Sequence, residues 1–262
     1  MQTISDWLTQ AAKQIPRLDA EIIVARVLKL DDRAFIFAHG EQELSDKQLA
    51  ECDAILRRRA QGEALAIIFS SKEFYGRDFW IDGGKVLIPR PESEDIITLA
   101  KEIKPKTILD IGTGSGCLAI TLALELPHAK VSACDISDDA LRIATKNSES
   151  HKCKIKFYKS DLLQEAGKLP ELIVANLPYV DANWDWLDKN ALSYEPATAL
   201  YAEQGGLALI FKLIEQIEKK KHGAGHVLLE ADPCQHRDII EFAKNHQLSL
   251  EKKLNYILQF SY

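Results

Sequence analysis

The sequence of 262 residues lacks several features that would assign it to a class at once. It has no apolar run near the ~20 residues that cross a bilayer, and no charged-then-apolar segment at its N-terminus. Its five cysteines show no CxxC spacing, so neither a zinc motif nor a disulfide framework is indicated. We therefore expect a cytoplasmic protein with no membrane contact, reduced structural thiols and no bound metal.

Positive charge is also scarce. Lysine and arginine together number 33, against 39 aspartates and glutamates, so the formal net charge is −6. Proteins that track long stretches of phosphate backbone present a basic surface. The composition therefore argues against direct binding of nucleic acid. No feature of the sequence requires an obligate oligomer, so we expect a monomer.

The first 64 residues show helical patterns. Apolar residues recur at helical spacing in the first twelve residues and again in LDAEIIVARVLKL. Ser45 and Gln48 form a capping-box pair before a further helix, and Gly62 is placed to end that helix. Residues 1–64 are therefore predicted to form a small N-terminal helical domain.

The pattern changes after residue 64. Between residues 65 and 92, β-branched and aromatic residues form short runs with Gly83 and Gly84 as a turn signal, which predicts a β-hairpin linker. From residue 93 to residue 262, helical segments alternate with the apolar strands TILDI, KVSACD, KIKFY, ELIVAN and HVLLE. This alternation is typical of a parallel, doubly wound α/β sheet.

A glycine-rich loop follows the first strand of this sheet. TILDI runs directly into GTGSG at residues 112–116, where a backbone without Cβ atoms can approach a ligand at the carboxyl edge of the sheet. The spacing is neither the GxGxxG of dinucleotide-binding proteins nor a phosphate loop with its following Lys-Ser/Thr. The loop therefore favours S-adenosylmethionine over NAD or ATP.

Acidic residues at the strand ends extend the predicted cofactor site. Asp135 ends the second strand, where its carboxylate can accept hydrogen bonds from both ribose hydroxyls of an adenosine. Asp110 is placed to face a cationic amino group, and Asp161 to hold an adenine amino group beside the apolar Leu162. The predicted cofactor contacts are Asp110, Gly112, Thr113, Gly114, Ser115, Gly116, Asp135, Asp161, Leu162 and Asn176.

The tetrapeptide Asn176-Leu177-Pro178-Tyr179 emerges from the fourth strand at the same edge. It suits a planar nitrogen, whose delocalised lone pair makes it a poor nucleophile that must be held in line with a methyl carbon. The Asn176 side-chain oxygen and the Leu177 carbonyl can accept that nitrogen's hydrogens, and Tyr179 can stack on the planar group. We predict these four residues to be catalytic and substrate-binding, acting by positioning without an acid–base dyad or a covalent intermediate.

Over nearly its whole length the chain resembles the protein-glutamine methyltransferase family (PrmC/HemK), which modifies peptide-chain release factors. The matching stretches are LDAE, the RRR helix with EALAIIFSSKEFYG, LIPRPESE (87–94), DIGTGSG (110–116), NLPY (176–179), YEPATAL (194–200) and GGL (205–207). LIPRPESE and YEPATAL are more specific than the glycine loop. The resemblance implies a seven-stranded Rossmann-like, S-adenosylmethionine-dependent methyltransferase domain over residues 93–262.

The resemblance also implies a substrate and roles for residues. Residues 112–116, Asp135, Leu162 and Asn176 would touch S-adenosylmethionine, and residues 176–179 would hold the glutamine of a release factor's Gly-Gly-Gln loop. The N-terminal helical domain and the hairpin would dock the release factor. Glu195 and Pro196 would lie in a loop that borders the site.

The sequence departs from the family pattern in places. Leu177 stands where the family has proline, Ser93 where it has threonine, and LLEADPCQ and LEKKLNYILQFSY replace familiar C-terminal stretches. Other functions stay open on the residues alone. NLPY also occurs in rRNA adenine dimethyltransferases, so an rRNA or DNA adenine methyltransferase is one alternative. A glutamine methyltransferase of a ribosomal protein and a cofactor-binding protein without transfer activity are the others.

Overall fold

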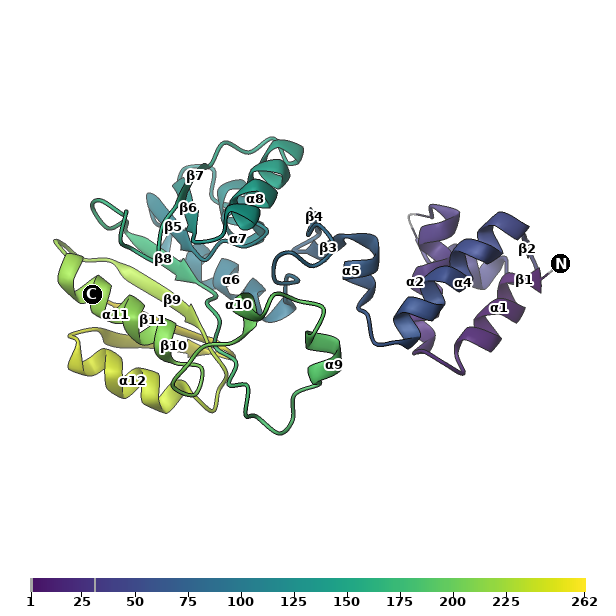
Figure 1. Cartoon of the computed structure of the whole chain (residues 1–262). Helices are drawn as coiled ribbons and strands as arrows, with labels where there is room; N and C mark the ends of the chain where they lie inside the picture. The colour runs from purple at the N-terminus through teal and green to yellow at the C-terminus, as the bar shows by residue number, and fades with distance from the viewer. Residues whose placement is uncertain (1, 31) are drawn as a thin grey trace. The chain divides into compact units, whose positions relative to one another are not determined.

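The structure is a computed structural model that describes residues 2–30 and 32–262. The chain divides into two compact units, Met1–Phe69 and Ser70–Tyr262 (Figure 1). Each unit has its own hydrophobic core, with one buried cluster in the first unit and two in the second.

The first unit is mainly helical. Its elements are β1 (Gln2–Thr3), α1 (Ile4–Ala11), α2 (Arg17–Leu28), α3 (Ala34–Ala38), β2 (Glu43–Leu44), α4 (Asp46–Ala60) and α5 (Leu65–Phe69). The predicted capping box of α4 is confirmed, because Ser45 Oγ accepts from the amide of Gln48 and the Gln48 side chain accepts from the amide of Ser45. Thr3 and Asp6 form an equivalent box at the start of α1.

Two features of this unit were not anticipated by the sequence patterns. Gln2 pairs with Leu44 and Thr3 with Glu43 in a short two-stranded sheet, because strands of two residues carry no detectable periodicity. Residues 65–69, which were assigned to the hairpin, are helical instead. Leu65 and Phe69 pack against the core of the first unit, and this packing favours a helix despite the β-branched residues between them.

A β-hairpin opens the second unit. β3 (Ser71–Phe74) pairs antiparallel with β4 (Arg77–Trp80), and the turn lies at Tyr75 and Gly76. The predicted turn at residues 83–84 was wrong, since these glycines form a separate turn after β4 in which Gly84 N donates to Ile81 O. Phe74 and Phe79 of the hairpin are buried in the core of the second unit.

A seven-stranded sheet organises the rest of the second unit. In chain order the remaining elements are η1 (Pro91–Ser93), α6 (Glu94–Ile103), β5 (Thr107–Ile111), α7 (Cys117–Glu125), β6 (Lys130–Asp135), α8 (Asp138–Ser150), β7 (Lys156–Lys159), β8 (Leu172–Ala175), α9 (Lys189–Leu192), α10 (Ala197–Leu200), α11 (Ala208–Lys220), β9 (His226–Glu230), α12 (His236–Asn245), β10 (Ser249–Leu254) and β11 (Ile257–Ser261). The strand order is β10-β11-β9-β8-β5-β6-β7. The predicted seven-stranded, Rossmann-like α/β domain is confirmed.

The sheet is parallel except at one end. β5 lies between β6 and β8, with Leu109 opposite both Ser132 and Ile173, and β9 extends the parallel part next to β8. β11 pairs antiparallel with β9, and the edge strand β10 pairs antiparallel with β11, which the prediction of a parallel sheet did not include. The side chains of β10 are mostly exposed, so this edge strand lacks the apolar pattern that marks the inner strands.

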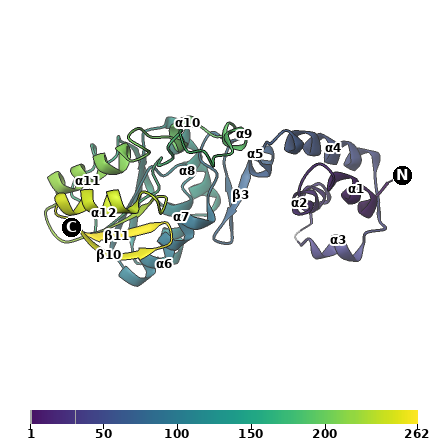
Figure 2. The ribbon, with the colours of Figure 1, turned by 90° about the horizontal axis from the view of Figure 1, so that it is seen from below.

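Helices cover both faces of the sheet, so that the strands form a middle layer. Figures 1 and 2 show α11 and α12 side by side on one face, and α6 lies on the other. Alternate strand residues point to opposite faces. Leu109 belongs to the cluster under α11 and α12, whereas Ile108 belongs to the cluster with α6 and α7. Because β5, β6 and β8 run parallel, their carboxyl ends meet at one edge of the sheet.

Candidate active site

A cavity of about 200 Å³ lies at this carboxyl edge. Most of the predicted site residues line it, namely Gly112, Thr113, Gly114, Ser115, Asp135, Asp161, Leu162, Asn176, Leu177 and Pro178. Asp110, Gly116 and Tyr179 are not among the lining residues, but Asp110 and Gly116 are hydrogen-bonded to Thr113, and Tyr179 directly follows Pro178 in the chain. The fold therefore brings the predicted residues together around one space.

The glycines of the loop serve different purposes. The amide of Gly114 donates to Asp135 Oδ2 at 2.9 Å, and no atom lies within 4 Å of the position that a Cβ would occupy. Gly114 therefore leaves open space on the cavity side of the loop. At Gly116 a Cβ would lie 3.0 Å from the Cβ of Ala144 on α8, so this glycine permits close packing of the loop and helix.

Asp110 lies behind the loop. Its side chain is 1% exposed, and Oδ2 accepts a hydrogen bond of 2.6 Å from Thr113 Oγ1. Within the described part of the chain, the buried Oδ1 has no hydrogen-bond partner. Burial raises the pKa of Asp110 to about 7. A positive charge on this side of the cavity would stabilise the ionised Asp110 carboxylate. Asp110 does not line the cavity itself, but Thr113, which donates to it, does.

Asp135 braces the loop from the end of β6. Its two oxygens accept from the amides of Gly114 and Ser137, each at 2.9 Å. Burial raises the pKa of Asp135, and the two amide hydrogen bonds oppose this shift. The next residue, Ile136, lines the cavity although 64% of it is exposed. Ile136 was not predicted from the sequence. It could have been found as the apolar residue that directly follows the carboxylate at the end of β6.

Asp161 and Leu162 form the cavity wall after β7. Lys212 Nζ on α11 donates to Asp161 Oδ2 at 2.6 Å, and Gln164 Nε2 donates to the same oxygen at 3.1 Å. These contacts fix the carboxylate and were not foreseen. Leu162 is buried in a left-handed conformation with φ +53°, and its carbonyl accepts a hydrogen bond of 2.7 Å from Ser160 Oγ.

Asn176 and Tyr179 meet in a buried hydrogen-bond network. Asn176 Nδ2 donates to Ser93 Oγ at 2.9 Å, and Ser93 Oγ donates to Glu230 Oε2 at 2.5 Å. The hydroxyl of Tyr179 donates to the other oxygen of Glu230 at 3.3 Å. Burial raises the pKa of Glu230 to about 7 and that of Tyr179 far above its usual range. Ser93 and Glu230 were not predicted as site residues, because each is remote in sequence from Asn176.

The motif is held in place from several sides. The Leu177 side chain is buried in the core, and its Cδ2 would lie 3.0 Å from a Cβ at Gly112. The side chain therefore has a packing role beyond the carbonyl function that the sequence predicted. A Cβ at Gly206, where φ is +85°, would lie 1.9 Å from the carbonyl oxygen of Tyr179. Gly206 is required so that its loop can approach the motif.

Glu195 ties two loops that border the cavity. Its Oε2 accepts a hydrogen bond of 2.8 Å from the amide of Ile88, and Oε1 accepts from Arg90 at 2.5 Å. The two resemblance stretches LIPRPESE and YEPATAL therefore contact each other directly. Pro196, which the resemblance placed in a loop bordering the site, lines the cavity, and the lining residues from these stretches that were not predicted individually are Leu87, Pro89, Arg90, Ser93, Thr198 and Ala199.

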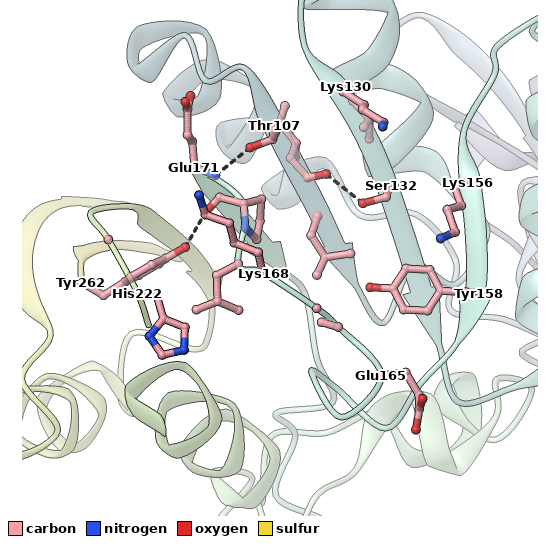
Figure 3. A pocket seen from close by; sticks show the side chains of 18 of the residues that line it. Thr107, Lys130, Ser132, Lys156, Tyr158, Glu165, Lys168, Glu171, His222 and Tyr262 are labelled. Carbon is pink, nitrogen blue, oxygen red and sulfur yellow. Dashed lines mark hydrogen bonds between the residues drawn. The ribbon is translucent and has the colours of Figure 1, made fainter. Parts of the chain in front are cut away.

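A second hollow of about 920 Å³ lies near the amino ends of β5 and β6 (Figure 3). Thr107, Lys130, Lys156, Lys168 and Tyr262 contribute to its lining. None of the predicted site residues, all of which the structure describes, lies there. We therefore place the candidate site at the carboxyl edge.

Residues 2–30 and 32–262 contain no group of three or more His, Cys, Asp or Glu side chains arranged to hold a metal ion. In the same ranges, no helix has the length and apolar character of a membrane span.

Known protein families match both units of the chain. A family model described as the PrmC N-terminal domain matches residues 1–69, and one described as the methyltransferase small domain matches residues 93–218. A "release factor glutamine methyltransferase" of Koribacter versatilis is 39% identical over 83% of this chain and 81% of its own length. One from Escherichia coli is 36% identical over 86% of this chain and 84% of its own length.

The fold is shared with solved structures at low identity. The crystal structure of a methyltransferase from Pyrococcus furiosus superposes with a TM-score of 0.54 at 20% identity, covering 83% of this chain and 97% of that one. This likeness shows the fold alone.

Proposed function

The chain belongs to the release factor glutamine methyltransferase family, and on that premise we propose that it methylates a release-factor glutamine. The methyl group passes from S-adenosylmethionine to the side-chain amide nitrogen of the glutamine in the Gly-Gly-Gln motif, which tunes translation termination. The observation that carries the proposal is the position of the Asn176 side chain. It borders the cavity directly after β8, and Ser93 fixes its carboxamide.

The cavity suits an adenosine-containing cofactor. Gly114 leaves open space, and the Asp135 carboxylate keeps lone pairs for ribose hydroxyls beyond the two amides it already binds. Ile136 offers an apolar surface for a base. When bound, S-adenosylmethionine supplies a methyl group activated by a positively charged sulfur. The residues assigned to the cofactor are Asp110, which acts by way of its hydrogen bond from Thr113, together with the loop 112–116, Asp135, Asp161, Leu162 and Asn176.

Asn176 and Leu177 hold the substrate nitrogen. The Asn176 Oδ1 and the Leu177 carbonyl oxygen each accept a hydrogen bond from the glutamine amide, and Pro178 keeps the preceding carbonyl in an extended backbone. The ring of Tyr179 packs against the planar amide. Methylation replaces one N–H bond of the amide by an N–C bond, and the displaced proton leaves to water. Positioning of this kind contributes up to about 7–11 kcal/mol in well-aligned systems.

The N-terminal helical unit is the docking module for the release factor. Leu18 and Phe37 support this role, because they are 51% and 69% exposed on that unit. The protein acts as a monomer in the cytoplasm, where its substrate is made. The net charge of −6 supports a protein partner over direct contact with nucleic acid.

A panel of substrates tests this proposal. The full chain is incubated with labelled S-adenosylmethionine and, separately, with a release factor, its loop Gln→Ala variant, a ribosomal protein fraction and rRNA. We expect label on the wild-type release factor alone.

Each other outcome contradicts the proposal in a distinct way. Label on rRNA identifies an adenine methyltransferase, and label on a ribosomal protein identifies a different protein substrate. Cofactor binding with no label on any substrate identifies a binding protein without transfer activity.

A further inference from the structure

The side chains behind Asn176 form a chain of hydrogen bonds with defined directions. Ser93 ends η1 and is 3% exposed, and Glu230 ends β9 and is 1% exposed. The distances are 2.9 Å from Asn176 Nδ2 to Ser93 Oγ and 2.5 Å from Ser93 Oγ to Glu230 Oε2. The network therefore joins three strand or helix ends at the edge of the cavity.

The direction of each hydrogen bond follows from proton counting. A serine hydroxyl has one hydrogen, and an ionised carboxylate can only accept. If Ser93 donates to Glu230, its oxygen can only accept from Asn176, so Asn176 must present its NH₂ group. The carboxamide is planar, with its oxygen and nitrogen on opposite sides. Asn176 Oδ1 is then turned away from Ser93, and within the described residues no group donates to it.

We propose that Ser93 and ionised Glu230 are positioning residues that orient the Asn176 carboxamide with Oδ1 toward the substrate nitrogen. This inference rests on the proposed function, in which that oxygen accepts a hydrogen from the glutamine amide. Neither residue touches the substrate. Without the pair, Asn176 can present either end, and its NH₂ group would repel the hydrogens of the target amide.

Protonation of Glu230 reverses the directions. A neutral carboxyl group can donate to Ser93 Oγ, which frees the Ser93 hydrogen to donate to Asn176 Oδ1. The carboxamide then turns its NH₂ group toward the cavity. Burial raises the pKa of Glu230 to about 7, and the hydrogen bonds from Ser93 and Tyr179 oppose this shift. The productive arrangement is therefore lost as the pH falls through about 7.

The charged and titratable groups around Glu230 come from several elements. Arg90 favours the carboxylate, whereas Glu92 disfavours it. Cys117 on α7 and Tyr256 between β10 and β11 belong to the same surroundings, since Glu230 raises the pKa of Cys117 and Tyr256 that of Tyr179. Burial raises the pKa of Cys117 to about 12 and that of Tyr179 far above its usual range, so among these groups Glu230 is the one that titrates near neutral pH.

Variants of Ser93 test the positioning role by kinetics. We expect Ser93→Ala to lower kcat by up to about 100-fold, while cofactor Kd measured by calorimetry changes little. Ser93→Thr keeps the hydroxyl and should restore most of the rate. Ser148→Ala is the matched control, because Ser148 is also buried and donates to the carbonyl of Cys153 at 2.6 Å. An unchanged kcat in Ser93→Ala, or no rescue by threonine, overturns the proposal.

A titration followed by NMR tests the orientation without methyl transfer. In protein labelled with ¹⁵N-asparagine, the Asn176 carboxamide signals are identified by their loss in Asn176→Ala. We expect them to shift with an apparent pKa near 7 in the protein without cofactor and to stay constant in Glu230→Gln. The kcat of Glu230→Gln should also lose the acid limb of the wild-type pH profile.

The two readouts separate this inference from the proposed function. Carboxamide signals that do not titrate, or that titrate equally in Glu230→Gln, overturn the positioning role even if the protein methylates release factors. Titrating signals in a protein that transfers no methyl group would support the network and contradict the proposed function instead.

Discussion

The side chain of Gln235 binds the main chain of Tyr179, with Nε2 donating to the Tyr179 carbonyl at 2.7 Å. The same Nε2 donates to the carbonyl of Gly205, also at 2.7 Å, so one buried carboxamide joins the motif to the neighbouring glycine loop. Gln235 belongs to LLEADPCQ, one of the stretches that depart from the family pattern. This chain therefore fixes its motif with a residue that the resemblance did not point to.

Replacement of Gln235 by leucine should loosen the motif. Two backbone carbonyls lose their donor, so we expect the free energy of unfolding to fall by about 1–3 kcal/mol and kcat to fall as well. Urea unfolding and steady-state kinetics measure the two effects. Tyr262→Phe is the control, because it removes one 2.7 Å hydrogen bond to the carbonyl of Pro170 away from the cavity. A normal kcat in the destabilised Gln235→Leu protein would show that the two hydrogen bonds of Gln235 serve stability alone.

Gly114→Ala should weaken cofactor binding more than it weakens the fold. Gly114 has φ +53° and open space around the Cβ position, so alanine costs about 1–2 kcal/mol of backbone strain and places a methyl group in the cavity. Gly76→Ala is the matched control, since Gly76 has φ +72° and open space at the hairpin turn. Calorimetry should show a higher cofactor Kd for Gly114→Ala only. Equal Kd values would remove Gly114 from the cofactor site.

The local features of this chain could be predicted from its sequence, and the long-range ones could not. The Ser45–Gln48 cap depends on residues three apart, and the strand ends that place Asp135 and Asn176 follow from apolar runs. The Ser93–Glu230 hydrogen bond joins residues 137 apart, and no periodic pattern encodes it. The exposed strand β10 was missed because a polar edge strand looks like a loop.

Stability of the protein without cofactor should fall as the pH rises from about 4 to above 7. Burial raises the pKa of Asp110 to about 7, whereas an unfolded aspartate ionises near 4, so the folded state binds more protons between these values. The stability from neutral Asp110 is complete below about pH 4 and is lost as the pH passes through 7. Asp110→Asn should reduce this loss in urea unfolding at pH 5 and pH 8.

An exposed aspartate provides the control for that experiment. Asp185→Asn should leave the difference between the two pH values unchanged, because Asp185 is exposed. Glu230, whose pKa is also raised to about 7, contributes in the same direction and remains in both variants. If Asp110→Asn loses as much stability as the wild type between pH 5 and pH 8, the assigned titration of Asp110 is wrong.

Phe37→Ser should weaken docking of the release factor. Phe37 is 69% exposed on the first unit, so its replacement removes apolar surface available to a partner without disturbing the core. We expect a higher KM for the release factor with unchanged cofactor Kd. Leu250→Ser, which alters a residue 41% exposed on β10, is the control and should keep the wild-type KM. An unchanged KM in Phe37→Ser would exclude this surface from docking.

The most direct test of the account is mass spectrometry of the release-factor peptide after reaction with the wild-type chain and with Asn176→Ala. The account predicts one added methyl group on the side-chain nitrogen of the Gly-Gly-Gln glutamine for the wild type. It predicts almost none for Asn176→Ala, although calorimetry should show that the variant still binds cofactor. A methyl group on another residue, or near-normal methylation by Asn176→Ala, would contradict the account.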